Sequence, residues 1–255
     1  GDSVGSSPTV VDGTVFVGSN DTSIYAVDAA TGDQQWAVDT GDHVTSSPTV
    51  VDGTVFVGSD DGTLYALDAA SGDSQWTVAT DRKVESSPTV ADGTVFVGGW
   101  EQLHAIDAAT GDEQWRVDAT VVSSPTVADG TVFVTGAGGL LYALSAATGD
   151  REWAFTTKSS LHSSPTVADE TVFFESLRTV YAVDAATGAQ QWSLPIGGRS
   201  SPRCGPGSRD QAPARGFGWE PLATTGIDAS CDGFAPVVVA LVAPLGFSGR
   251  AANPV

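Results

Sequence analysis

The chain has 255 residues, of which 31 are acidic and 11 are basic, and its formal net charge at pH 7 is −20. The only lysines are Lys83 and Lys158. Such a negative charge repels phosphates and acidic headgroups, so the composition argues against nucleic acid and anionic membrane surfaces as partners of the whole molecule.

A stretch of about 40 residues recurs along the chain, and this period is one signature of propeller or solenoid architectures. Five copies are complete, and a sixth begins at Pro202 before the resemblance to the others stops. The copies start with SSPTV around Pro8, Pro48, Pro88, Pro125 and Pro165. They close with Trp36, Trp76, Trp115, Trp153 and Trp192.

Each copy predicts four short strands, because alternating Val, Phe, Ile and Tyr positions are broken by turn residues. In the first copy the strands are residues 6–10, 14–19, 24–29 and a segment that contains Trp36. Asp12-Gly13 suits a tight turn with positive φ. The fifth copy has Asp169-Glu170 there, and we expect a different turn, since a left-handed Glu costs about 1–2 kcal/mol.

Four antiparallel strands repeated at this period predict an all-β fold, a β-propeller of four-stranded blades. Five complete repeats are compatible with an open or a truncated array. The recurring tryptophans have a physical purpose in that fold, because a blade cannot bury both faces alone and a large side chain can wedge against its neighbour. The alternative is a row of aromatic rings that stacks on carbohydrate.

The pattern AxDxxTGxxxW resembles the repeats of pyrroloquinoline quinone (PQQ) type propellers. It starts at Ala26, Ala66, Ala105, Ala143 and Ala182, with Ser71 in place of the threonine and Ser145 in place of the aspartate. The resemblance implies that Trp36, Trp76, Trp115, Trp153 and Trp192 dock adjacent blades. It leaves function open, since the family includes quinone-dependent dehydrogenases, outer-membrane assembly lipoproteins and sensor or binding propellers. PQQ is a cofactor candidate through this resemblance alone.

The chain divides into repeats over residues 1–202 and a divergent Gly-, Pro-, Arg- and Ala-rich tail over 203–255. The tail has two explanations, a partner-specific extension or a reading-frame error after the sixth SSP. Cys204 and Cys231 lie in this tail. They could form a disulfide or half of a metal site, and the alternative is that they have neither role. The chain has no methionine and begins inside a repeat. We therefore expect a longer, exported protein whose signal is not visible.

The acidic, lysine-poor composition also resembles that of proteins from salt-loving archaea, where salt screens the repulsion between carboxylates. An ordinary acidic protein is the alternative. A prediction from the halophile interpretation is that added salt stabilises the fold.

No sequence pattern predicts a catalytic set or a metal site. The aspartates stand at repeated turn positions, where hydrogen bonds to nearby backbone explain them. The three histidines, His43, His104 and His162, occupy non-equivalent positions, and we interpret each as structural or solvated. The apolar run APVVVALVAPLGF is too short, and too interrupted by proline, for a transmembrane helix.

The turns divide into two classes in an up-and-down blade, because successive turns alternate between the two ends of the strands. The Asp-Gly and ATGD turns share one end and are nearly constant, whereas the turns after the second strand and the links between blades vary. The variable segments contain most of the basic residues of the repeats. They define a candidate ligand-binding set of Arg82, Lys83, Trp100, Lys158, Arg178 and Arg199. The alternative is that these loops vary in sequence only because surface loops tolerate any polar residue, without a role in binding.

These observations favour a noncatalytic, exported propeller that binds or assembles with a protein or a small polar or anionic ligand. A fragment of a PQQ-dependent dehydrogenase and a sensor domain of a longer signalling protein are the alternatives. The sequence does not indicate the oligomeric state.

Overall fold

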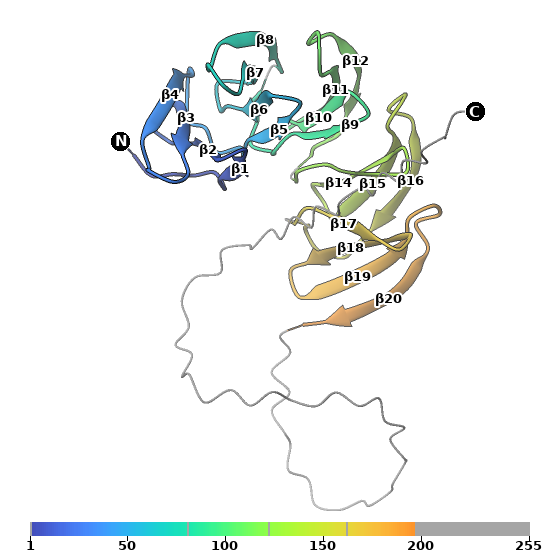
Figure 1. The fold of residues 1–255 in the computed structure, drawn as a ribbon. Coiled ribbons are helices and arrows are strands. Elements are labelled where there is room, and N and C mark those ends of the chain that lie inside the picture. The colour runs from blue at the N-terminus through green and yellow to red at the C-terminus, as the bar shows by residue number, and fades with distance from the viewer. Residues whose placement is uncertain (1, 81, 122, 162, 197–255) are drawn as a thin grey trace, which may run out of the picture. The chain divides into compact units, whose positions relative to one another are not determined.

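The fold is built from five four-stranded antiparallel sheets, as the repeats predict (Figure 1). The computed structural model describes residues 2–80, 82–121, 123–161 and 163–196. Within these residues every element is a β-strand, and none is a helix of the length and apolarity that a membrane crossing needs. The tail with Cys204 and Cys231, the sixth SSP, Arg199 and His162 all lie outside the described residues.

Each sheet is one blade, and its strands follow the chain in order. The first blade consists of β1 (Thr9–Val11), β2 (Thr14–Gly18), β3 (Ser23–Asp28) and β4 (Gln34–Asp39). The second consists of β5 (Thr49–Val51), β6 (Thr54–Gly58), β7 (Thr63–Asp68) and β8 (Ser74–Ala79). The third consists of β9 (Thr89–Ala91), β10 (Thr94–Gly98), β11 (Gln102–Asp107) and β12 (Glu113–Asp118).

The last two blades repeat the same order. The fourth consists of β13 (Thr126–Ala128), β14 (Thr131–Gly136), β15 (Leu140–Ser145) and β16 (Arg151–Thr156). The fifth consists of β17 (Thr166–Ala168), β18 (Thr171–Ser176), β19 (Thr179–Asp184) and β20 (Gln190–Pro195). In all five blades the pairing of the third and fourth strands shifts register at a bulge after the alanine that faces the tryptophan, as at Ala26 and Trp36.

The first strand of each blade is shorter than predicted. It begins at the residue after proline, such as Thr9, rather than at the first serine. Proline has no N–H to donate to a ladder. The serine two residues before the proline makes a side-chain contact instead: Ser6 Oγ donates to the carbonyl of Gly18 at 3.0 Å and accepts from its N–H at 2.8 Å. Equivalent bonds at Ser46, Ser86, Ser123 and Ser163 tie each link between blades to the end of the second strand of the blade that follows it.

The turn at Asp169-Glu170 contradicts the expectation of a different shape. Asp169 has φ 47° and Glu170 has φ 59°, so both adopt the left-handed conformation seen at Asp12 and Gly13. The flanking strands explain this result, because Ala168 and Thr171 pair in the same register as their counterparts in the other blades. The ladder therefore imposes the tight turn on a residue that does not favour it.

The ATGD turn is held by its aspartate, as predicted. The Asp28 carboxylate accepts the N–H groups of Ala30 and Thr31 at 2.9 and 2.8 Å, and Gly32 follows in a left-handed conformation with φ 78°. The Thr31 N–H, with that of Ala30, lowers the pKa of Asp28, since these bonds favour the ionised form. Equivalent bonds lower the pKa of Asp68 and Asp107.

Ser145 occupies this position in the fourth blade and allows a test of the carboxylate. Its turn keeps the backbone bonds from Ser145 N to Asp150 O and from Gly149 N to Ser145 O, both 2.8 Å. We predict that Ser145→Asp raises the Tm at pH 7. Because hydrogen bonds depress the folded pKa of the equivalent Asp28, Asp68 and Asp107, the gain should be fully present above the unfolded pKa of about 4 and should be lost as the pH falls through the folded pKa. Thermal unfolding at pH 7 and pH 3 measures it.

The matched control is Ser145→Asn, whose amide oxygen accepts the same bonds without titrating. We expect its gain to be equal at both pH values. A gain from Ser145→Asp that is as large at pH 3 as at pH 7 would contradict the assigned role of the charge.

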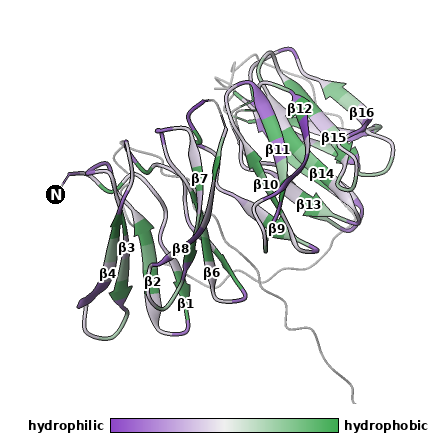
Figure 2. Cartoon of the chain, turned by 90° about the horizontal axis from the view of Figure 1, so that it is seen from above, coloured by the Kyte–Doolittle hydropathy of each residue, from purple (hydrophilic) through white to green (hydrophobic). Residues whose placement is uncertain are grey.

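The hydrophobic core lies between consecutive blades rather than inside one blade. Four clusters of buried residues each combine side chains from two neighbouring blades. The first, for example, joins Phe16 and Trp36 to Val55, Val57 and Leu67 of the next blade. Figure 2 shows that the strands carry most of the hydrophobic residues. Each blade therefore depends on its neighbours for stability, as in other repeat architectures.

Candidate binding face

The turns after the second strands lie beside the links between blades. Backbone hydrogen bonds join them in successive blades: Thr40 N to Thr22 O at 2.7 Å, Thr80 N to Gly62 O at 2.7 Å, and Ala119 N to Glu101 O at 3.0 Å. We call these segments together the loop face. Its turns are residues 19–22, 59–62, 99–101, 137–139 and 177–178, and its links include 40–45, 82–85, 119–121 and 157–161.

The loop face is held rigidly by close contacts at its base. A glycine ends the second strand in the first three blades, and a valine of the following link packs directly on it. A Cβ added to Gly58 would lie 2.2 Å from Cγ1 of Val84, and one added to Gly18 would lie 2.3 Å from Cγ1 of Val44. No residue with a Cβ fits at Gly18 or Gly58 without displacing the valine. The variable segments are therefore attached to strand ends whose packing is the same in these blades.

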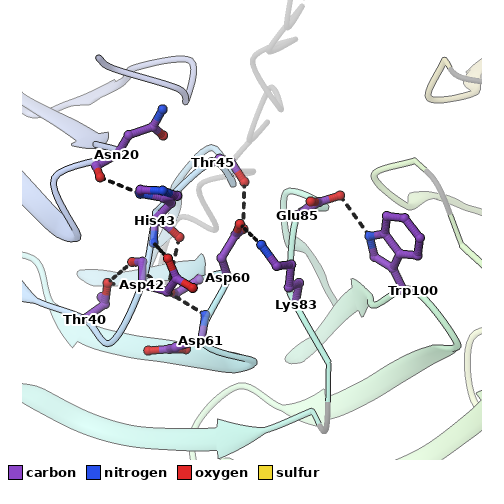
Figure 3. A network of polar contacts seen from close by, with 11 residues as sticks. Asn20, Thr40, Asp42, His43, Thr45, Asp60, Asp61, Lys83, Glu85 and Trp100 are labelled. Atoms are coloured by element: carbon purple, nitrogen blue, oxygen red, sulfur yellow. Dashed lines mark hydrogen bonds and ion pairs between the residues drawn. The ribbon is translucent and has the colours of Figure 1, made fainter. Parts of the chain in front are cut away.

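A polar network centred on Asp60 connects the links on either side of the second blade (Figure 3). The Asp60 side chain is only 6% exposed, and it accepts a hydrogen bond from Lys83 Nζ at 2.6 Å. Thr45 Oγ1 donates to the other carboxylate oxygen at 3.3 Å. The bond to Asp60 raises the pKa of Lys83, because it favours the ammonium form.

The neighbouring Asp61 fixes the turn itself. Burial raises the pKa of its carboxyl, but hydrogen bonds from Tyr65, Gly41 and Thr63 outweigh burial and lower it. The Tyr65 hydroxyl donates to Asp61 at 2.7 Å, and burial together with this bond raises the pKa of Tyr65 to about 12. Both groups therefore keep their charge states near neutral pH, and their geometry indicates a structural role.

Trp100 stands at the mouth of a hollow on the loop face. Its indole is 59% exposed, and its Nε1 donates to the Glu85 carboxylate at 3.0 Å (Figure 3). The hollow has a volume of about 220 Å³ and is lined by Glu85, Trp100, Ser86, Ser123, Ser124 and Ser164. The serines come from the SSP motifs of three blades. An exposed aromatic ring beside polar groups is a composition typical of protein interfaces.

The structure brings three of the predicted ligand residues together. Arg82 and Lys83 lie in one link, and Arg82 pairs with Glu101 beside Trp100 at 3.2 Å. Both partners of that ion pair are more than half exposed, so the pair adds little stability and remains accessible.

Lys158 and Arg178 are exposed in the last link and last turn of the loop face. Within the described part of the chain, no hydrogen bond or ion pair joins them to the first group. Arg199 falls outside it. The role of all six residues in binding stays a prediction.

Glu85, Asp60 and the serines are not among the residues predicted from the sequence. Glu85 and Asp60 look like ordinary solvated acids among 31. The serines carried a detectable signal, since one precedes every repeat proline by a fixed spacing. His104 is almost fully buried in the third blade, and its Nδ1 lies 3.2 Å from Glu113, which fits the structural interpretation. His43 contacts the backbone carbonyl of Asn20 (Figure 3).

Comparison with known families identifies the repeats. The family model described as outer membrane protein assembly factor BamB matches residues 1–49, 20–123 and 99–210, which together span most of the chain. The chain belongs to this family of PQQ-type repeat proteins. The comparison with curated proteins found no match.

Two solved structures share the fold. BamB from Moraxella catarrhalis is 26% identical with a TM-score of 0.66, and the match covers 76% of this chain and 62% of that one. Quinohemoprotein alcohol dehydrogenase from Comamonas testosteroni is 20% identical with a TM-score of 0.68, covering 76% of this chain and 43% of that one. This second likeness shows the fold alone. The chain spans less than two thirds of the length of either protein.

Proposed function

We propose that this chain is a noncatalytic propeller module that binds a protein partner through the loop face. The observation that carries the proposal is the exposed Trp100, held by Glu85 at the mouth of a serine-lined hollow. Large aromatic and arginine side chains dominate binding energy at protein interfaces, and here Arg82 lies on the same surface. The family description as an assembly factor supports a protein partner.

The location of the protein is part of this proposal. A family described by an outer-membrane assembly factor favours an exported or cell-surface protein. Cell fractionation with an antibody against the chain tests this point directly, and a signal confined to the cytosolic fraction would overturn it.

The experiment is an affinity capture with the full chain, followed by titration of the purified partner. Trp100→Ala and Arg82→Glu should each weaken binding at least about tenfold. The matched control is Arg116→Glu, because Arg116 lies on strand β12 and its side chain is 55% exposed, close to the 61% of Arg82. Asp52→Asn, at the opposite end of the strands, should also bind normally. Equal loss in all four variants would overturn the proposal.

A quinone-dependent dehydrogenase is the alternative that the fold raises. A quinone with its calcium ion needs several oxygen ligands around the metal. Among the described residues, no group of three or more His, Cys, Asp or Glu side chains lies close enough to hold a metal ion. Absorbance of the purified chain after addition of PQQ and calcium tests the alternative, and the flanking gene sequence tests the sensor alternative.

A further inference from the structure

The second blade shows how the loop face holds a cation. Lys83, in the link that follows this blade, reaches back to the turn of the blade, and its Nζ lies 2.6 Å from the nearly buried carboxylate of Asp60. In the link that precedes the blade, Thr45 Oγ1 donates to the other oxygen of that carboxylate at 3.3 Å (Figure 3). The chain therefore places its own ammonium group between the two links at this blade.

The third blade has the same backbone arrangement with different side chains. In both blades a valine of the following link packs on the glycine that ends the second strand, and this contact fixes the alignment of the two blades. The equivalent pairs are Lys83 and Thr120, Asp60 and Trp100, and Thr45 and Glu85. Because residues 119–121 contain no basic side chain, this part of the link supplies no cation to the third blade.

The hollow beside Trp100 occupies the equivalent position in the third blade. Glu85 from the preceding link and Val121 from the following link both line it, and its volume is about 220 Å³. Its lining residues belong to the third, fourth and fifth blades, and none of them lies at an end of the described chain. The third blade thus has an open space where the second blade holds the side chain of Lys83.

Glu85 gives this hollow an uncompensated negative charge. Its carboxylate accepts the Trp100 indole N–H at 3.0 Å, and within the described part of the chain no ion pair involves it. Figure 3 shows Glu85 directed toward Trp100. The basic residues of the same link are paired with other acids, Lys83 with Asp60 and Arg82 with Glu101. A cation that enters the hollow therefore meets a carboxylate without a competing positive partner.

The other walls of the hollow also suit a cation that carries several N–H donors. Ser123, Ser124 and Ser164 each accept one backbone N–H through Oγ, and a hydroxyl oxygen has a second acceptor site. The Trp100 side chain is 59% exposed, and the face of an indole attracts a cation through its π electrons. The hollow thus combines a charged acceptor, neutral acceptors and an aromatic face.

We propose that the hollow beside Trp100 receives an arginine side chain of the protein partner. A guanidinium group is flat, carries five N–H donors and has no acceptor, so it can stack on the indole while it donates to Glu85 and to serine oxygens. It takes the place that Lys83 fills in the second blade. The net charge of −20 also favours the approach of a basic segment. This inference rests on the proposed function, because it identifies the part of the partner that contacts Trp100.

The first test is an NMR titration of the isotope-labelled full chain with Nα-acetyl-arginine amide. The readout is the indole N–H signal of Trp100, which Trp100→Phe assigns among the signals of the seven tryptophans. We expect a saturable shift of this signal at millimolar probe. The matched probe is Nα-acetyl-citrulline amide, which has a neutral urea of nearly the same shape in place of the guanidinium. It should bind at least about fivefold more weakly, because it lacks the charge.

Three further variants test the assigned residues with the arginine probe. Glu85→Gln removes the charge but keeps an oxygen that accepts the Trp100 N–H, and it should weaken binding about fivefold. Glu175→Gln is the matched control, because Glu175 is exposed on β18 of the fifth blade, and it should bind like the unchanged chain. Thr120→Lys introduces a cation at the position equivalent to Lys83 and should weaken binding at least about tenfold through like-charge repulsion.

Thr120→Gln is the control for the size of the introduced lysine, and it should weaken binding less than Thr120→Lys. Three results would each overturn the proposal: a Trp100 signal that does not respond to the arginine probe, equal affinity for the citrulline probe, or equal effects of the two Thr120 variants.

Titration of the partner separates this inference from the proposed function. If Trp100→Ala weakens partner binding while Glu85→Gln does not and the arginine probe does not bind, the proposed function stands and this inference is wrong. If the arginine probe binds but no captured partner depends on Trp100, the proposed function is wrong and the cation site stands.

Discussion

Trp36→Ala should lower the free energy of unfolding by about 3–5 kcal/mol, the usual cost of removing a buried aromatic side chain. Three interactions are lost together. The indole donates to the Ala69 carbonyl at 3.0 Å, its ring lies 5.8 Å from that of Phe16, and Gly72 packs on its face. Chemical denaturation with fluorescence and circular dichroism measures the loss, which corresponds to roughly 10 °C in Tm for a domain of this size.

Trp192→Ala is the control, because the same residue type at the same repeat position contacts no further blade among the described residues. Its ring keeps the contact with Phe173 at 5.9 Å, yet the side chain is 45% exposed. We expect a cost of about 1 kcal/mol. Equal costs for the two variants would show that the tryptophans stabilise their own blades, and the predicted docking role would be wrong.

The fold was predictable because its information is local and repeated. The alternation around Phe16 and the turn at Asp12-Gly13 specify strands and hairpins without any distant contact, and five copies of the pattern remove ambiguity. The prediction of a different turn at Glu170 was wrong because the conformation of that residue depends on strand pairing rather than on local preference. Its left-handed backbone is imposed by the pairing of β17 with β18, and residue preference is too weak to resist a ladder of several hydrogen bonds.

The candidate site was predictable only in part. Turn alternation correctly placed Arg82, Lys83 and Trp100 in neighbouring variable segments, because the direction of the strands determines the end at which each turn lies. The sequence could not show that Asp60 is nearly buried under Lys83, or that Glu85 reaches the indole of Trp100. Those contacts depend on how one blade is rotated against the next, and that rotation is set by packing rather than by a local pattern.

Raising the salt concentration from 0.01 to 1 M should increase the Tm by on the order of 10 °C, because the Debye length falls from about 30 Å to about 3 Å. Two carboxylates about 10 Å apart in water repel by roughly 0.4 kcal/mol. With a net charge of −20, many such pairs remain uncompensated, and the described residues contain only three ion pairs that involve arginine or lysine. Their summed repulsion is therefore several kcal/mol at low salt.

A variant separates this charge effect from general effects of salt on hydrophobic burial. Asp12, Asp52, Asp92 and Asp129 stand at equivalent exposed turn positions with φ between 47° and 49°. Asparagine tolerates that left-handed conformation as aspartate does. Replacing all four by Asn changes the net charge from −20 to −16, since four negative charges are removed. The variant should have a higher Tm than the unchanged chain at 0.01 M salt. Its Tm should rise less than that of the unchanged chain when the salt is raised to 1 M. If both proteins gain equally, salt acts through burial rather than screening, and the halophile interpretation loses its physical basis.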